Sequence, residues 1–239
     1  MATTLNLWRH HLGKVPPSLW HDTGLRVLIL ADNQLTEVPA GIARLRELRT
    51  LDLGHNELTS VPDALGDLPA LTDYLYLHDN RLTELPATLG RLTALRYLNI
   101  GENRIGTLPD TIGDLAALVE LRAQHNRLTT LPDSVGRLHR LRELWLRGNA
   151  IDRLPDSVAG LTELRHLDLR ENALPQVPRP LAGLPLLRGL DLRANRLSRL
   201  PEWLDRLPAL EKLDLRWNDL EPQPRLDEAL ARRGCVVLR

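Results

Sequence analysis

Residues 48–58, which read LRTLDLGHNEL, decide the fold of this chain. Leu51 and Leu53 alternate with polar residues, and a period of two indicates a short strand that sends its leucines to one side. The amide of Asn56 can then satisfy backbone groups that a tight turn leaves unpaired. Val61-Pro62 and Leu65-Gly66 follow, and the proline fixes φ where the chain turns back. The stretch therefore predicts a strand, a turn, and a compact helical or irregular return segment.

This pattern recurs over essentially the whole chain. Asparagines stand at positions 33, 56, 80, 103, 126, 149, 172, 195 and 218, with a spacing of 23 residues except for one gap of 24. A single unit cannot bury its own leucines, so neighbouring units must stack. Stacking predicts a parallel sheet on one face, the return segments on the other, and a leucine core between them.

The pattern L-x-x-L-x-L-x-x-N-x-L resembles the signature of the leucine-rich repeat. The 23-residue period and the Leu/Val-Pro step resemble the intracellular, Ras-group type of repeat. The resemblance implies an α/β solenoid shaped as a curved right-handed horseshoe, with a parallel β-sheet on the concave face and short helical or irregular returns on the convex face. Members of this family bind unrelated partners, so the fold leaves the partner open.

We expect a single leucine-rich-repeat domain over residues 1–239, with about eight regular repeats in 25–218. Residues 1–24 are expected to form an N-terminal cap repeat, since His10 replaces the asparagine and Asp22 replaces a leucine.

The last segment, 219–239, is expected to be a C-terminal cap with a short helix and a last strand. Gly234 should end that helix. Val236 and Leu238 fall at the core positions of the last strand when the 23-residue period is continued, and Cys235 then points outward beside Lys212.

Composition and charge narrow the class of protein. Lys+Arg and Asp+Glu both number 31, so no global field favours nucleic acid or an anionic membrane surface. The N-terminus lacks a basic start followed by an apolar run, and no stretch approaches the roughly 20 apolar residues of a membrane-spanning helix. A single cysteine rules out an intrachain disulfide framework. We expect a cytoplasmic monomer with no nucleic-acid or membrane partner.

Aromatic side chains mark the middle of the predicted concave face. All three tyrosines fall at outward-facing strand positions although aromatics make up only 3% of the chain. Neighbouring strands lie about 4.8 Å apart, so these tyrosines should form one patch, and Tyr, Trp and Arg often anchor interfaces. The alternative is a set of scattered aromatics that bind nothing. The predicted partner-binding residues are Tyr74, Tyr76, His78, Tyr97, Asn99, Arg122, Trp145, Arg147 and Arg170.

Two charged columns occupy the last repeats. The residues concerned are Asp168, Asp191 and Asp214 in one column and Arg147, Arg170, Arg193 and Arg216 in the next. Opposite charges on neighbouring strands favour a mutual salt-bridge ladder that neutralises itself. An acidic partner clamped by the arginines is the alternative.

The 24-residue unit adds one residue between Leu71 and Leu75. An added residue at this position predicts a β-bulge. Such a bulge could re-aim side chains at a binding site, or it could merely loosen one turn.

The common catalytic motifs are absent from the sequence: it has no Walker-type loop, no dinucleotide-binding glycine motif, no nucleophile elbow and no His-Glu-x-x-His. One column next to the asparagines holds ligand-type residues, namely Asp32, His55, Asp79, Glu102 and His125. Solvated turn residues are the commoner interpretation, and metal binding requires converging geometry. Cys235 is expected to be an inert thiol. We therefore expect no catalytic residues, no cofactor and no metal.

The function predicted from these features is a non-catalytic scaffold or adaptor that engages a protein partner on the concave sheet face, for example in signalling. The alternatives are the repeat region of a larger signalling or ligase protein, and a regulatory module associated with an enzyme. A designed consensus array is a further alternative, against which stand the 24-residue unit, the uneven face and the divergent first repeat.

Overall fold

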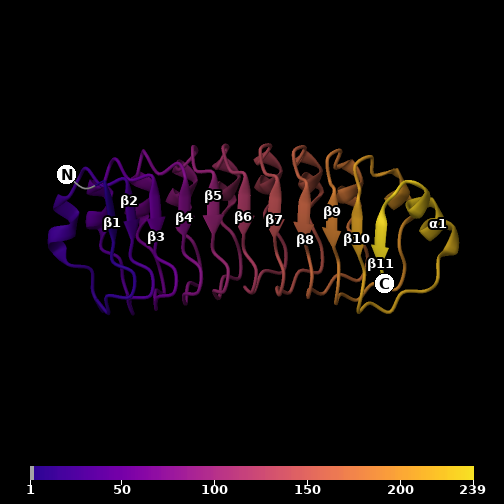
Figure 1. The fold of residues 1–239 in the computed structure, drawn as a ribbon, viewed down its shortest axis with the longest axis horizontal. Helices are drawn as coiled ribbons and strands as arrows, with labels where there is room; N and C mark the ends of the chain where they lie inside the picture. Colours follow the sequence, from indigo (N-terminus) through magenta and orange to yellow (C-terminus); the bar gives the residue numbers. More distant parts are fainter. Residues whose placement is uncertain (1–2) are drawn as a thin grey trace.

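The computed structural model describes residues 3–239 and confirms the predicted solenoid: the strands form one parallel sheet in sequence order (Figure 1). Within the described residues the sheet is open, with β1 and β11 as its two edges. Met1 and Ala2, which belong to the predicted N-terminal cap, lie outside the described residues. The strands are β1 (Thr4–Asn6), β2 (Val27–Ile29), β3 (Thr50–Asp52), β4 (Tyr74–Tyr76), β5 (Tyr97–Asn99), β6 (Glu120–Arg122), β7 (Glu143–Trp145), β8 (His166–Asp168), β9 (Gly189–Asp191), β10 (Lys212–Asp214) and β11 (Val236–Leu238).

The return segments are 3-10 helices of five residues each, which confirms the predicted short helical returns. A proline precedes each of them in an extended conformation; Pro62, for example, has φ −71° and ψ 150°. Because proline fixes φ and donates no hydrogen bond, it starts the helix where an N–H would have no partner. The helices are Pro17–His21, Ala40–Arg44, Asp63–Asp67, Ala87–Arg91, Asp110–Asp114, Asp133–Arg137, Asp156–Gly160, Arg179–Gly183 and Glu202–Arg206.

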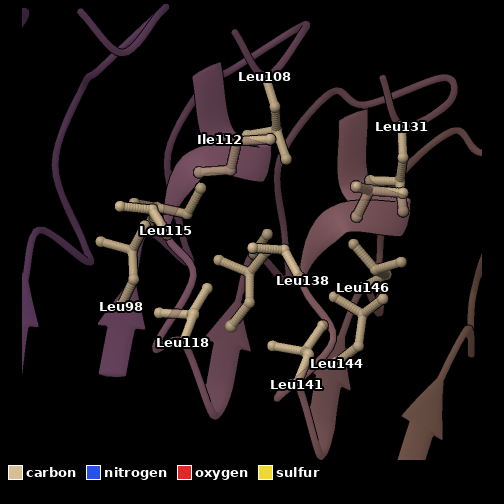
Figure 2. Close-up of a cluster of buried hydrophobic side chains, with 14 of the residues drawn as sticks. Leu98, Leu108, Ile112, Leu115, Leu118, Leu131, Leu138, Leu141, Leu144 and Leu146 are labelled. Carbon is tan, nitrogen blue, oxygen red and sulfur yellow. The ribbon is translucent and has the colours of Figure 1, made fainter. Parts of the chain in front are cut away.

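The core lies between the sheet and the 3-10 helices and is built almost entirely from leucine. In each interior strand the middle residue is buried; Leu51 and Leu75 are both 0% exposed. Figure 2 shows how the strand leucines Leu98 and Leu144 lie on the same side as Ile112 from a 3-10 helix. Each leucine removed from water stabilises the fold by roughly 1.5–3 kcal/mol. One repeated aliphatic layer thus runs the length of the solenoid.

The asparagine ladder holds consecutive turns together, as its regular spacing predicts. The Asn56 Nδ2 group donates to the carbonyl oxygens of Leu53, Gly54 and Leu30, each at 3.0 Å. Its Oδ1 atom accepts the backbone N–H of Asn33 and Leu35, also at 3.0 Å. Since a buried, unpaired backbone group is costly, each asparagine stabilises its own turn and the preceding repeat together.

The extra residue of the 24-residue unit lies directly before β4. The strand pairing itself is regular, with Tyr74 opposite Thr50 and Tyr97. Asp73 donates its N–H to the Arg49 carbonyl at 3.0 Å, whereas the carbonyl of Thr72 accepts from Arg96 at 2.9 Å. The irregularity predicted as a β-bulge therefore sits at the entrance of the strand, and the ladder beyond it stays in register.

The chain ends in helix α1 (Pro224–Arg232) and strand β11, beyond β10 in Figure 1. Leu226 and Leu230 of α1 are buried, and Gly234 follows the helix with φ +79°. In residues 3–239 no helix has the length and apolarity needed to cross a membrane. Whether 1–24 and 219–239 act as caps remains a prediction.

The register predicted for the last strand is wrong by one residue. Val237, and neither Val236 nor Leu238, pairs with the core residue Leu213 and packs against the core. Val236 is 55% exposed, while Cys235 is buried instead of pointing outward. The segment containing α1 uses one residue more than a regular repeat, and a slip of one residue moves every side chain to the opposite face of a sheet.

Candidate binding face

The face of the sheet that points away from the 3-10 helices carries the first and third residue of each strand, and we call it the sheet face. In each interior strand the middle leucine is buried in the core, so only the outward positions vary in chemistry between these repeats. Parallel pairing in strict register places equivalent positions of successive repeats side by side. Side chains at the same position of successive repeats therefore form a row across the sheet.

Three tyrosines form one packed group on strands β4 and β5, as the sequence predicts. The ring centroids of Tyr76 and Tyr97 are 5.1 Å apart, those of Tyr74 and Tyr97 5.4 Å, and those of Tyr74 and Tyr76 5.9 Å. These separations are typical of aromatic pairs that attract one another. We refer to Tyr74, Tyr76 and Tyr97 as the tyrosine cluster.

Further rings and a cation extend the cluster in both directions. On one side the His78 ring lies 5.9 Å from Tyr76 and 4.7 Å from His55. On the other side the guanidinium of Arg122 lies 5.9 Å from the Tyr97 ring and 5.4 Å from the Trp145 ring. Arg122 thus bridges the tyrosine cluster and Trp145, and an unbroken row of rings and one guanidinium reaches from His55, in the turn after β3, to Trp145 on β7.

Two glutamates fix the orientation of this row. The Nε atom of Arg122 donates to Oε1 of Glu120, and the Nε1 atom of Trp145 donates to Oε2 of Glu143 at 3.2 Å. The sequence prediction omitted both glutamates. They could have been found, because each stands two residues before the side chain that it holds, on the same face of the same strand.

Partial burial raises the pKa of two tyrosine hydroxyls, those of Tyr76 and Tyr97. Burial raises the pKa of Tyr97 to about 12. Burial and the neighbouring Tyr74 also raise the pKa of Tyr76 above its usual value. Both phenols remain neutral at pH 7 and offer O–H donors beside apolar ring surface, a combination common in protein interfaces.

A hollow of about 390 Å³ borders the tyrosine cluster at the start of the strands. Its lining includes the rings of Tyr74 and Tyr97 and the charged side chains of Asp73, Arg96 and Glu120. The extra residue of the 24-residue unit supplies this border, since Asp73 stands directly before β4. Aromatic walls with charges at the rim suit a partner side chain better than a flat sheet does.

Asn99, predicted as a contact residue, lies beside the cluster but exposes only 7% of its surface. Its Oδ1 atom accepts the backbone N–H of Gly101 at 3.0 Å. Its side chain therefore supports the strand end and offers little area to a partner.

The arginines of the predicted site divide into two groups. Arg122 belongs to the aromatic row, whereas Arg147 donates twice to Oε1 of Glu171, at 2.8 and 3.1 Å. The Nε atom of Arg170 lies 3.8 Å from the same oxygen. These two predicted site residues are thus gathered around a glutamate that the sequence prediction did not consider.

The salt-bridge ladder predicted for the last repeats forms in part. Arg193 pairs with Asp191 and with Asp214, and Arg216 pairs with Asp214 at 2.7 Å. Asp168 has no salt bridge among residues 3–239 because its predicted partners bind Glu171 instead.

Two family models match the sequence and identify the fold independently. The model of a leucine-rich repeat region matches residues 64–147, and the model of a leucine rich repeat matches 23–82 and 178–220. The chain is a leucine-rich-repeat protein. The Ras-group subtype remains a prediction. No curated protein matches the sequence at a significant level.

Solved leucine-rich-repeat structures resemble the chain over most of its length. The Arabidopsis receptor kinase HAESA, in complex with the peptide hormone IDA and the co-receptor SERK1, superposes with a TM-score of 0.78 and 29% identity over 92% of this chain and 39% of that one. The plant peptide hormone receptor RGFR1, in complex with RGF2, gives a TM-score of 0.72 and 28% identity over 94% of this chain and 41% of that one. The chain thus spans about two fifths of the length of these receptors.

An internalin (inlF) from Listeria monocytogenes shares the fold at 21% identity, with a TM-score of 0.70 over 94% of this chain and 70% of that one. Leucine-rich-repeat domains are protein-interaction modules, and the fold is typically a non-catalytic binding scaffold.

The column of ligand-type residues beside the repeat asparagines lies in left-handed backbone, with φ from 50° to 57°. His55 Nδ1 contacts Asp79 Oδ2 at 2.5 Å, and His55 Nε2 lies 3.2 Å from His78 Nε2. No group of three or more metal-ligating side chains converges within residues 3–239. His55 therefore extends the aromatic row.

Burial raises the pKa of the Cys235 thiol. Since the thiolate is the reactive form, a raised pKa favours the inert thiol that the sequence predicts.

Proposed function

We propose that this leucine-rich-repeat chain is a non-catalytic binding module that engages a protein or peptide partner on its sheet face, centred on the tyrosine cluster. The observation that carries the proposal is the concentration of all three tyrosines of the chain at one place, joined to Trp145 through Arg122. Tyr, Trp and Arg dominate the binding energy of interfaces out of proportion to their number.

The scaffold favours binding because it holds these side chains in place before a partner arrives. The tyrosine rings pack on one another, Arg122 is held by Glu120, and the strands beneath are fixed by the leucine core. Side chains that are already ordered lose little conformational entropy on association. The peptide complexes of the similar receptor structures support the choice of a protein or peptide as the partner class.

We place this binding in the cytoplasm and expect the chain to act as a monomer. A role as the repeat region of a larger signalling or ligase protein is compatible with the same binding face, because the site lies in the middle repeats and needs neither chain end.

The experiment that tests the proposal is quantitative affinity capture from the source cell, read by mass spectrometry. Wild type is compared with the double variant Tyr76→Ala/Trp145→Ala and with the control Trp217→Ala, which removes an exposed tryptophan outside the strands. We expect the partner recovered with wild type to fall at least about tenfold with the double variant, since two interface anchors contribute about 2 kcal/mol or more each.

The control should retain the partner, and circular dichroism should show that both variants are folded. Equal recovery of the same proteins by wild type and the folded double variant would contradict the proposal.

A further inference from the structure

A second hollow, of about 180 Å³, lies on the sheet face over strands β8 to β10. It exists because Gly189 has no side chain while its neighbours in the sheet, His166 and Lys212, do. A Cβ atom at Gly189 would come within 2.8 Å of the His166 ring. Its other polar and aromatic lining residues are Trp145, Asp168, Asp191 and Asp214.

Two of the three carboxylates in this hollow are already neutralised. Asp191 is bound by Arg193, whose Nε atom donates to Oδ1 at 2.9 Å. Asp214 is bound by Arg216 at 2.7 Å and contacted by Arg193 at 3.4 Å. These two carboxylates, on β9 and β10, therefore need no further cation.

Asp168 is the exception. It is 8% exposed, and its Oδ1 atom accepts the backbone N–H of Arg170 at 2.9 Å. Within residues 3–239 no donor bonds to its second oxygen and no cation pairs with it, because Arg147 and Arg170 are gathered at Glu171. Burial, reinforced by Asp191, raises the pKa of this carboxyl. A buried carboxylate without a cation is costly, so a positive group from outside would be bound favourably.

Trp145 forms the opposite wall. Its strand lies between β6, which carries Arg122, and β8, which carries Asp168. Trp145 therefore has one cation beside it on the side of the tyrosine cluster and the hollow on the other. Aromatic faces attract a second guanidinium in the same way.

Lys212 is the competing charge at the rim. It is exposed and has no salt bridge to any residue in 3–239. Its ammonium group does not occupy the carboxylate site, but it weakens the attraction of the hollow for an incoming cation.

We propose that this hollow binds the side chain of an arginine of the protein partner, with the guanidinium on the carboxylate of Asp168 and its plane against Trp145. Arginine fits better than lysine because its planar fork matches a carboxylate and stacks on an aromatic ring. The proposal extends the proposed function by naming the chemistry of one partner residue, at a place separate from the tyrosine cluster.

The test uses the full ¹⁵N-labelled chain and two blocked tripeptides, acetyl-Gly-Arg-Gly-amide and the same peptide with neutral citrulline in place of arginine. Binding is followed by NMR. We expect the arginine peptide to shift the backbone amides of Gly189 and Asp191 and the indole signal of Trp145, and the citrulline peptide to bind at least about fivefold more weakly, since it lacks the charge. A tripeptide is too short to reach the tyrosine cluster, so this result is independent of the partner capture described above.

Three variants complete the test. Asp168→Asn keeps the oxygen that accepts from Arg170 and should weaken binding of the arginine peptide about tenfold, or about 1.4 kcal/mol. Lys212→Gln should strengthen binding about threefold because it removes the competing charge. Asp152→Asn, the same change at an exposed residue, is the matched control and should leave the affinity for the arginine peptide unchanged.

The urea midpoint of Asp168→Asn should be equal to or above that of wild type, because the residue is not needed as an anion for folding. Equal shifts with the citrulline peptide, or an unchanged affinity of the folded Asp168→Asn variant, would overturn the proposal.

Discussion

The tyrosine cluster on β4 and β5 and the charged columns at β8 to β10 lie on the same face of one sheet, yet their side chains behave differently. The tyrosines pack on one another and keep ring surface and hydroxyl donors on the sheet face. The charged residues mostly neutralise each other within the chain, as Asp191 and Arg193 do. The repeated strands, turns and 3-10 helices thus form a uniform backbone scaffold, whereas the outward side chains decide which part of the sheet face is available to a partner.

The first prediction has the largest expected effect, and it asks whether the asparagine ladder stabilises both regions equally. Asn103→Ala beneath the tyrosine cluster and Asn172→Ala near the charged columns each remove one acceptor and three donor contacts of the ladder. We expect each to lower the free energy of unfolding by about 3 kcal/mol, because buried carbonyl and N–H groups lose their partners.

Urea denaturation measures this loss, and the loss should be somewhat larger at Asn103, which is the more buried of the two. A loss below about 1 kcal/mol at both positions would show that the ladder is not what holds the repeats together.

The second prediction looks for a difference in the packing of the 3-10 helices. A Cβ atom at Gly113 would overlap the carbonyl oxygen of Ser134, whereas the nearest atom to one at Gly183 would be the Ala159 Cβ, at 3.1 Å. Gly113→Ala should therefore destabilise the chain by about 2 kcal/mol, and Gly183→Ala by less than about 1 kcal/mol. Thermal unfolding of both variants checks the ranking, and equal losses would mean that the 3-10 helices are packed alike in both regions.

The third prediction compares the forces within the two regions. A double-mutant cycle on Tyr76 and Tyr97 should give a coupling of about 1 kcal/mol that is insensitive to salt. The same cycle on Asp191 and Arg193 should give up to about 1 kcal/mol at low salt, and less in concentrated sodium chloride, because mobile ions screen the pair. Urea unfolding of the single and double variants supplies both cycles. Equal salt sensitivity of the two couplings would contradict the assignment of aromatic packing to one region and ion pairing to the other.

The smallest expected effect is a pH dependence that arises at His78. Burial and the neighbouring His55 lower the pKa of His78 below its usual 6.5. As the pH falls through 6.5 the unfolded chain takes up this proton before the folded chain does, so the folded state loses stability down to the folded pKa and no further from this group. His78→Gln should reduce the slope of stability against pH in this window, and an unchanged slope in the variant would contradict the assignment.

The sequence predicts the backbone of the solenoid well because the interactions that form each repeat are local and recur in every repeat. Alternating leucines, a turn asparagine and a proline occur in every regular repeat, so strand, turn and return segment follow from a single unit. The tyrosine cluster follows as well, since a parallel sheet in register places Tyr76 beside the strand that carries Tyr97.

Features that depend on the reach of a side chain could not be predicted in the same way. Arg147 pairs with Glu171 and not with Asp168 because of the distances between neighbouring turns. An alignment of the repeats does not contain these distances. The register of β11 depends on how many residues α1 uses, and a single added residue exchanged the predicted roles of Val236 and Val237. The burial of Asn99 likewise follows from its bond to the Gly101 backbone.

Site-specific photo-crosslinking in the source cell shows whether a partner contacts the tyrosine cluster. The photoreactive residue p-benzoylphenylalanine is placed at position 76 in one variant and, in a control variant, at position 206, an exposed position of the 3-10 helix Glu202–Arg206. We predict a discrete crosslinked protein from position 76 and none from position 206. The absence of any adduct at position 76, or the same adducts at both positions, would contradict this prediction.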